Sequence, residues 1–156
     1  MKNCLHLNRR SRTVRDKLGD SGLISDDTRL VASFRQKQRE HRANNPSGHR
    51  VLRYEIDGGM ITQGERCDFG MGIPDQATFY FIELKGKDLK KAVRQIISTI
   101  SVLLPILSGY IIHARVVLSR IQRPDLRSSE VIIFERTLAK QKGCLKRGCI
   151  VMEETI

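Results

Sequence analysis

The sequence predicts an α/β domain whose elements follow the order α-β-β-β-α-β-α-β. Apolar side chains in residues 89–104 follow the i, i+3, i+4 spacing of an amphipathic helix. The Phe-Tyr-Phe-Ile run at 79–82 precedes that helix and consists of strong strand formers. A chain of 156 residues, of which 40% are hydrophobic, is long enough for one domain with a buried core.

The composition limits the classes of partner. The chain carries 28 Lys and Arg residues against 17 Asp and Glu, a formal net charge of +11. Such an excess favours nucleic acid or an anionic surface as the partner. The sequence contains neither the roughly 18 apolar residues of a membrane span nor a signal peptide, so a cytoplasmic protein is expected. The four cysteines lack the spacing of a zinc site and are expected to be free thiols.

The N-terminal part divides into two segments. Residues 1–25 are expected to form a basic, partly irregular arm, and residues 26–156 a single domain. The domain begins with a predicted helix over residues 26–42, because Ser and Asp residues at its start can cap it. The Asn-Asn-Pro-Ser-Gly run at 44–48 ends this helix.

Three strands are expected next, as an antiparallel meander. Residues 51–56 form the first, and the Asp-Gly-Gly turn at 57–59 leads into the second, at 60–71. The third covers residues 78–85. The remaining elements are the helix that ends near Pro105, a strand at 113–121, a helix at 128–142 and a short strand at 149–152.

The hairpin between the second and third strands gathers three charged residues. If its turn is centred between residues 75 and 76, Asp68 and Glu83 lie opposite each other and share a face of the sheet. Lys85, two residues after Glu83, projects from the same face. Adjacent carboxylates repel unless positive charge lies between them, which indicates a divalent cation. The structural alternative is an exposed cross-strand ion network.

The spacing of Asp68 from the Glu83-Leu84-Lys85 triplet, set in an α-β-β-β-α-β order, resembles the PD-(D/E)XK nuclease superfamily, which includes restriction endonucleases and Holliday-junction resolvases. The resemblance covers about residues 26–121. It implies a restriction-endonuclease-like mixed sheet with a C-terminal α-β extension, and a nuclease that uses Mg²⁺ or Mn²⁺ to hydrolyse phosphodiester bonds, with DNA as the expected substrate. Asp68, Glu83 and the main-chain carbonyl of Leu84 would bind the metal. Lys85 would orient or help deprotonate the attacking water.

The literal Pro-Asp pair at 74–75 is not the expected metal-binding motif. Asp75 lies in the turn, about 25 Å from Glu83 along the strand. Members of the superfamily often add an acid from the first helix, for which Glu40 is the candidate and Glu55 the alternative. They also add a polar residue from the helix after the lysine, for which Gln95 is the candidate.

Several basic residues are candidates for phosphate contacts, although a charged helix face or tail is also commonly just solvated. These residues are Lys87, Lys91 and Arg94 in the second helix region, and Arg9, Arg10 and Arg12 in the N-terminal arm. Two other functions remain open: a non-catalytic nucleic-acid-binding module on the same fold, and a protein-interaction module such as an antitoxin, immunity or inhibitor protein. Specificity would come from a homodimer, a partner protein or the shape of the substrate.

Overall fold

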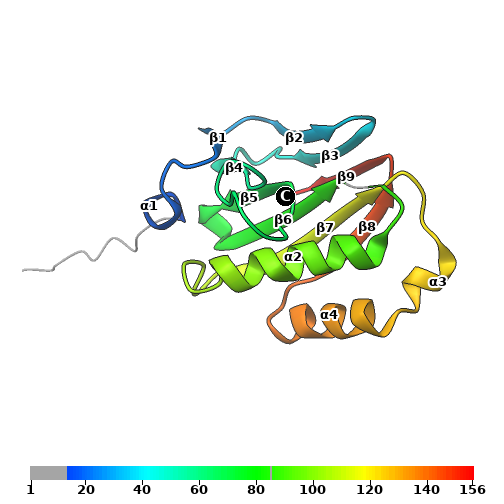
Figure 1. Cartoon of the computed structure of the whole chain (residues 1–156). Helices are drawn as coiled ribbons and strands as arrows, with labels where there is room; N and C mark the ends of the chain where they lie inside the picture. Colours follow the sequence, from blue (N-terminus) through cyan, green and yellow to red (C-terminus); the bar gives the residue numbers. More distant parts are fainter. Residues whose placement is uncertain (1–13, 85) are drawn as a thin grey trace, which may run out of the picture.

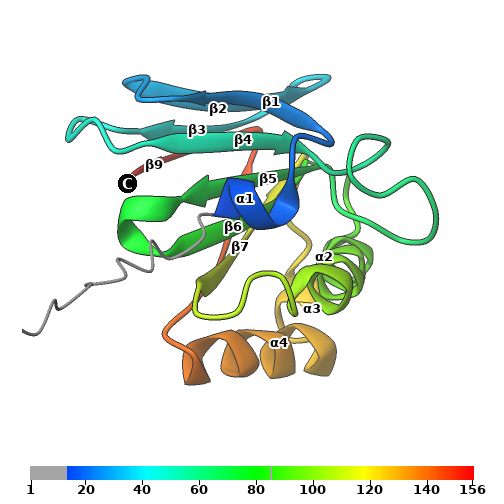
Figure 2. The same ribbon diagram turned by 90° about the vertical axis from the view of Figure 1, so that its left-hand side faces the viewer.

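In the computed structural model, residues 14–84 and 86–156 are described, and they form a mixed α/β protein. A three-stranded sheet, a six-stranded sheet and a layer of helices lie on top of one another (Figures 1 and 2). The α/β class agrees with the expectation from the sequence.

The six-stranded sheet is mixed, as expected, with the strand order β1-β4-β5-β6-β7-β8. Its first four strands pair antiparallel, and β6, β7 and β8 pair in parallel. The strands are β1 (Leu23–Asp27), β4 (Val51–Glu55), β5 (Phe69–Ile73), β6 (Thr78–Leu84), β7 (Ile111–Leu118) and β8 (Leu145–Cys149). The short 3₁₀ turn η1 (Pro74–Gln76) joins β5 to β6. The antiparallel meander β4-β5-β6 is therefore confirmed.

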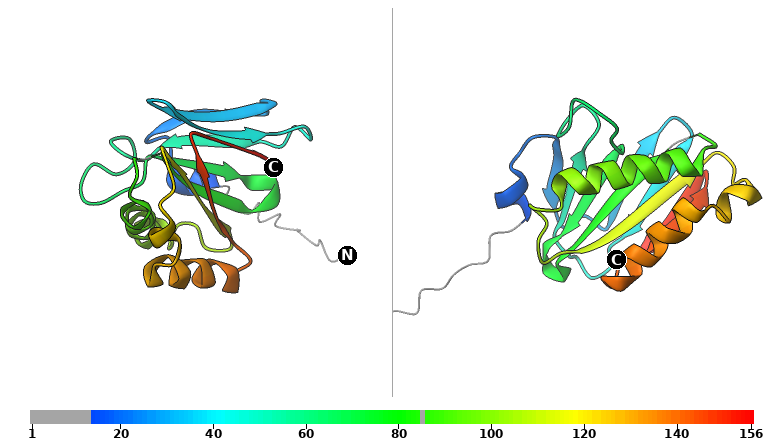
Figure 3. Two further views of the ribbon diagram at one scale, coloured as in Figure 1. Left: turned by 90° about the vertical axis from the view of Figure 1, so that its right-hand side faces the viewer. Right: turned by 60° about the horizontal axis from the view of Figure 1, so that its bottom comes forward.

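Helices α2 (Leu89–Leu103) and α4 (Ser129–Lys140) lie on the same face of this sheet (Figure 3). Helix α2 begins where the Asp88 side chain accepts a hydrogen bond from the Lys91 amide, 2.9 Å away, which satisfies one of the free amides of the first turn. The shorter helices are α1 (Val14–Leu18) and α3 (Arg123–Leu126). Phe79, Phe81 and Val93 belong to the apolar core between the sheet and the helices.

The second sheet covers the opposite face of the six-stranded sheet. Its strands are β2 (Val31–Gln36), β3 (Arg39–Asn44) and β9 (Val151–Thr155), in the order β2-β3-β9, with β3 and β9 parallel. Phe34 of β2 packs with Met71 and Ile82 of the larger sheet in a separate apolar core. Strand β6 therefore has an apolar core on both faces, and all seven of its residues are buried.

The predicted first helix over residues 26–42 is wrong, because this segment forms the end of β1, then β2 and most of β3. In β2 the buried residues alternate: Ala32 and Phe34 face the core, whereas Val31 is 44% exposed. A helix would also bring Leu30 onto the same face as the buried Phe34 four residues later, yet Leu30 is 68% exposed. Asp26 does not cap a helix but forms ion pairs with two arginines.

Other elements also differ from those predicted. The second strand of the meander begins at Phe69 rather than at residue 60, and residues 60–67 form turns and loop. The single final strand is two strands, β8 and β9, separated by Ile150 in the left-handed conformation (φ 62°). The arm predicted as partly irregular contains α1, whose Val14 is fully buried, and the start of β1.

None of the helices in the described part of the chain is long and apolar enough to cross a membrane.

Charged residues are buried between the two sheets and connect three strands. Arg115 of β7 donates to Glu154 of β9 over 2.6 Å, and His41 Nε2 of β3 lies 2.8 Å from the same carboxylate oxygen. Burial opposes ionisation of Glu154, but hydrogen bonds with His41 and Arg115 outweigh it and hold the pKa of this carboxyl well below its usual range. The cluster ties the two sheets together because it joins side chains of β3, β7 and β9. Removing one member would leave the polar or charged group of another buried without its partner.

His113 of β7 lies beside this cluster in its neutral form. Its ring stacks on Tyr80, with 4.8 Å between the ring centroids, and its Nδ1 accepts a hydrogen bond from the Cys144 amide (3.2 Å). Burial, reinforced by the Arg115 charge, lowers the pKa of His113 to about 4 from its ordinary value of 6.5. As the pH falls, the His113 imidazole is therefore protonated in the unfolded chain before it is protonated in the folded protein. The stability that depends on neutral His113 is complete above pH 6.5 and lost as the pH falls toward 4.

Replacing His113 should flatten the acid side of the stability profile. We expect wild type to lose about 1 kcal/mol more unfolding free energy than His113→Asn between about pH 7 and pH 5, measured by denaturant unfolding, after allowance for solvent screening. Asparagine retains an oxygen that can accept from the Cys144 amide. Parallel profiles for wild type and His113→Asn would contradict the assignment.

Candidate functional site

Asp68 and Glu83 meet at the open end of the β5–β6 hairpin. Phe69 pairs with Ile82 in the ladder, so the next position outward places Asp68 opposite Glu83, and the predicted register is confirmed. The Asp68 amide donates to Glu83 Oε2 (3.0 Å), and the Leu84 amide donates to Asp68 Oδ2 (2.7 Å). Each carboxylate is thus hydrogen-bonded to a backbone amide of the opposite strand, an arrangement that we call the carboxylate clasp.

The clasp is buried. Glu83 is 0% and Asp68 5% exposed, and their face of the hairpin is the one covered by α2. Carboxylates withdrawn from water need hydrogen bonds or positive charge in compensation, and the two backbone amides supply part of it. The alternative of an exposed ion network is therefore wrong for the two acidic residues.

Helix α2 holds the residues just before Asp68. The Thr99 hydroxyl accepts from the Cys67 amide and donates to the Gln95 carbonyl, both over 2.8 Å. The Gln95 side-chain amide donates to the Arg66 carbonyl over 3.1 Å. Gln95, predicted from the sequence, thus acts on the clasp through the backbone. Thr99 was not predicted from the sequence. The pattern that could have identified it is the pair of polar residues, Gln95 and Thr99, four positions apart in an otherwise apolar stripe of the helix.

The Glu83 carboxylate affects the pKa of the neighbouring Cys67 thiol. Cys67 is fully buried beside the clasp, and burial together with the Glu83 carboxylate raises the pKa of its thiol. Cys67 therefore stays protonated at neutral pH and contributes packing rather than a reactive thiolate.

The Leu84 carbonyl, a predicted metal ligand, already accepts hydrogen bonds. Arg39 Nε of β3 donates to it over 3.1 Å. In the orientation that satisfies its surroundings, the Gln36 amide nitrogen of β2 lies 3.1 Å from the same carbonyl and 2.9 Å from Asp68 Oδ2. The sequence missed both residues because their segment was predicted to be a helix.

The predicted accessory acids lie elsewhere. Glu40 is on a strand rather than a helix, and although burial raises its pKa, hydrogen bonds from Arg35 and Arg42 bring the pKa below its ordinary value. Glu55 pairs with Phe69 in the ladder. Because neighbouring strand residues point to opposite faces, this pairing directs Glu55 away from the face that carries Asp68.

The predicted phosphate-binding residues around α2 are all exposed, and they separate into two groups. Lys91 lines a hollow together with Gln95 and Arg66, so it lies beside the segment that leads into the clasp. Lys87 lines a second hollow, between the start of α2 and α3. Arg94 instead faces α4, where it lies 3.7 Å from Glu130. The predictions for Lys85, Arg9, Arg10 and Arg12 lie outside the described residues.

The clasp agrees in part with a magnesium site. Mg²⁺ is commonly bound by one or two carboxylates together with several waters, and Asp68 and Glu83 can supply the carboxylates. The Leu84 carbonyl, with donors from two side chains, fits less well as a ligand. No group of three or more His, Cys, Asp and Glu side chains within residues 14–84 and 86–156 forms a metal-binding cluster.

Comparison with protein-family models, curated proteins and solved structures gives no match for this chain.

Removing the Thr99 hydroxyl should destabilise the fold at the clasp. Thr99→Val keeps the shape but leaves the buried Cys67 amide without its acceptor, and we expect a loss of about 1–3 kcal/mol in chemical denaturation. The control is Thr137→Val on α4, where an exposed hydroxyl makes the same bond to the carbonyl four residues earlier. That variant should stay within about 0.5 kcal/mol of wild type. Equal effects of the two substitutions would contradict the role of Thr99.

Proposed function

We propose that the protein is a metal-dependent nuclease of restriction-endonuclease-like fold that hydrolyses phosphodiester bonds, with DNA as the substrate. The observation that carries this proposal is the buried carboxylate clasp at the end of β6, directly before the Lys85 of the Glu-x-Lys triplet. The antiparallel β4-β5-β6 meander, the following α2 and the parallel β7 support it. The strands that replace the predicted first helix are the main departure from the superfamily pattern.

The clasp provides what this reaction requires of a protein. A divalent cation held by Asp68 and Glu83 would supply a nucleophilic water at neutral pH and neutralise charge on the phosphate. In hydrolysis the water oxygen bonds to phosphorus, the bond from phosphorus to the leaving oxygen breaks, and a proton lost by the water is balanced by one gained by the leaving oxygen. Asp68 and Glu83 are fixed for this task by backbone amides, so little reorganisation is needed. The proposed role of Lys85 is to orient or deprotonate the water.

Two conservative substitutions test the clasp. Asp68→Asn and Glu83→Gln should each lower Mg²⁺- or Mn²⁺-dependent DNA cleavage by at least about 10²-fold and weaken Mn²⁺ binding in calorimetry, because each removes a charge from the proposed site. The control is Asp75→Asn in η1, the aspartate of the literal Pro-Asp pair, which should cleave like wild type.

The panel of substrates should include linear and circular duplexes, single strands, branched DNA and RNA. If the metal supports no cleavage of any of them by wild type, or if Asp75→Asn alone abolishes cleavage, the assignment is wrong.

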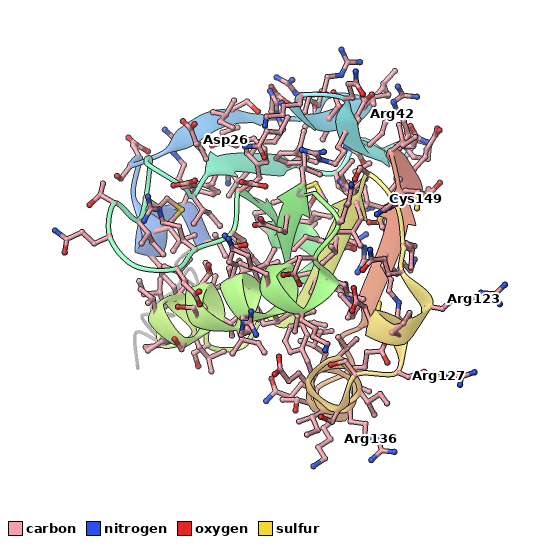
Figure 4. All side chains as sticks on the ribbon, turned by 45° about the vertical axis from the view of Figure 1, so that its right-hand side comes forward. Asp26, Arg42, Arg123, Arg127, Arg136 and Cys149 are labelled. Carbon is pink, nitrogen blue, oxygen red and sulfur yellow. The ribbon has the colours of Figure 1, made fainter. Side chains whose placement is uncertain are left out.

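A second candidate function is nucleic-acid binding without cleavage. Arg120, Arg123 and Arg127 follow the carboxyl end of β7, the strand that is parallel and adjacent to β6. All three are exposed, and none has a carboxylate within 4.0 Å among the described residues. Figure 4 shows Arg123 and Arg127 projecting away from the ribbon. We call these three residues the arginine edge, and unpaired cations of this kind suit phosphate contacts in either function.

The salt dependence of DNA binding tests the arginine edge. Replacing Arg123 and Arg127 together with Gln should weaken binding and reduce the slope of log K against log salt by about 2, since each phosphate contact contributes about 0.9. Fluorescence anisotropy with Ca²⁺ in place of Mg²⁺ measures the slope. The charge-matched control replaces Lys140 and Lys142, at the other end of α4, with Gln. The same change of slope in both double variants would show that net charge, not this edge, determines binding.

A further inference from the structure

The turn between β2 and β3 lies close to the carboxylate clasp, on the side of the smaller sheet. Gln36 and Arg39 form the last pair of the β2–β3 ladder, and the turn of Lys37 and Gln38 follows at once. Both ladder residues reach the end of β6, where they donate to the Leu84 carbonyl, and Gln36 also lies within hydrogen-bond distance of Asp68. The smaller sheet therefore contributes directly to the surroundings of the clasp.

Arg39 differs from the other arginines of this hairpin. Arg35 and Arg42 each lie 3.2 Å from a carboxylate oxygen of Glu40, so their charges are neutralised locally. Arg39 has no carboxylate within 4.0 Å among the described residues, and its Nη groups make no hydrogen bond within that part of the chain. A half-buried cation whose partner is a neutral carbonyl keeps its charge available for an anion.

The contact made by Arg39 also orients it. A guanidinium has five N–H donors in a rigid plane, and Nε alone is used on the Leu84 carbonyl. Fixing Nε leaves the edge formed by the two Nη groups for a second, bidentate partner, and phosphate oxygens match that geometry. A simple structural tie between the sheets would explain the Nε contact, but it would not require a residue whose two Nη groups carry four further N–H donors.

We propose that Arg39 binds the phosphodiester that is cleaved at the carboxylate clasp, with Nε anchored on the Leu84 carbonyl and the Nη edge on the phosphate oxygens. This inference rests on the proposed nuclease function. Negative charge increases on those oxygens in the transition state, and a cation already fixed beside them stabilises it without reorganisation. Arg39 makes and breaks no covalent bond and moves no proton. The Leu84 carbonyl acts as its anchor and not as a metal ligand.

Three variants of one hairpin test this assignment. Arg39→Ala should lower kcat for DNA cleavage by about 10²–10³-fold, as expected for loss of one oriented transition-state donor. Arg39→Lys keeps the charge but not the planar pair of donors, so an intermediate kcat is expected. Arg35→Ala removes an arginine from the same hairpin that is 70% exposed at its side chain, and it should stay within about twofold of wild type.

Two further measurements separate this inference from the proposed function. Mn²⁺ binding in calorimetry should be retained in Arg39→Ala, since no metal ligand is removed, whereas Glu83→Gln loses it. Binding of a fluorescein-labelled DNA duplex in Ca²⁺ should be weaker for Arg39→Ala than for Arg35→Ala. If wild type cleaves DNA and Arg39→Ala cleaves it as Arg35→Ala does, the inference is overturned and the nuclease proposal stands. If no variant cleaves, equal duplex affinities of these two variants overturn the inference independently.

Discussion

The register of β5 against β6 is the constraint on which the rest of the site depends. A slip by one residue would move Glu83 to the other face of the hairpin, under the smaller sheet. Close packing prevents the slip: the ring of Phe79 lies so near Gly70 that a Cβ there would be 2.7 Å from Phe79 Cζ. Glycine and phenylalanine are therefore complementary in one register, and the same register brings Asp68 and Glu83 together.

Two layers converge on the clasp from opposite sides. Helix α2 packs its apolar stripe on the sheet and uses Thr99 and Gln95 to hold the backbone just before Asp68. From the other side, Arg39 holds the Leu84 carbonyl just after Glu83. The carboxylates thus lie between two fixed backbone segments. Rigid support of this kind is what orients acidic groups that would otherwise turn toward water.

Helix α2, strand β6 and the register of the β5–β6 hairpin could be predicted from the sequence because each depends on residues that are close together in the chain. The apolar spacing of α2 and the aromatic run of β6 are local patterns, and the hairpin register followed from the centre of one short turn. The β2–β3 hairpin escaped prediction because its turn has Lys37 at φ 55° in place of the usual glycine or asparagine. Its partner β9 lies about a hundred residues later and pairs in parallel, which no local pattern encodes. Gln36 and Arg39 were missed for the same reason.

The buried charges between the sheets link this non-local pairing to the surroundings of the clasp. Arg115 and His41 bind one carboxylate, Glu154, and so fix β3 and β9 against β7. Arg39 is the first residue of β3 and His41 is the third, so the contact of Arg39 with the Leu84 carbonyl depends on how that cluster holds β3. The two backbone hydrogen bonds of the clasp join Asp68 only to Glu83 and Leu84, whereas the smaller sheet adds the Gln36 amide beside Asp68. Weakening the cluster should therefore disturb Arg39 more than the hydrogen bonds within the clasp, so the phosphate binding proposed for Arg39 and the metal binding proposed for the clasp can be separated by experiment.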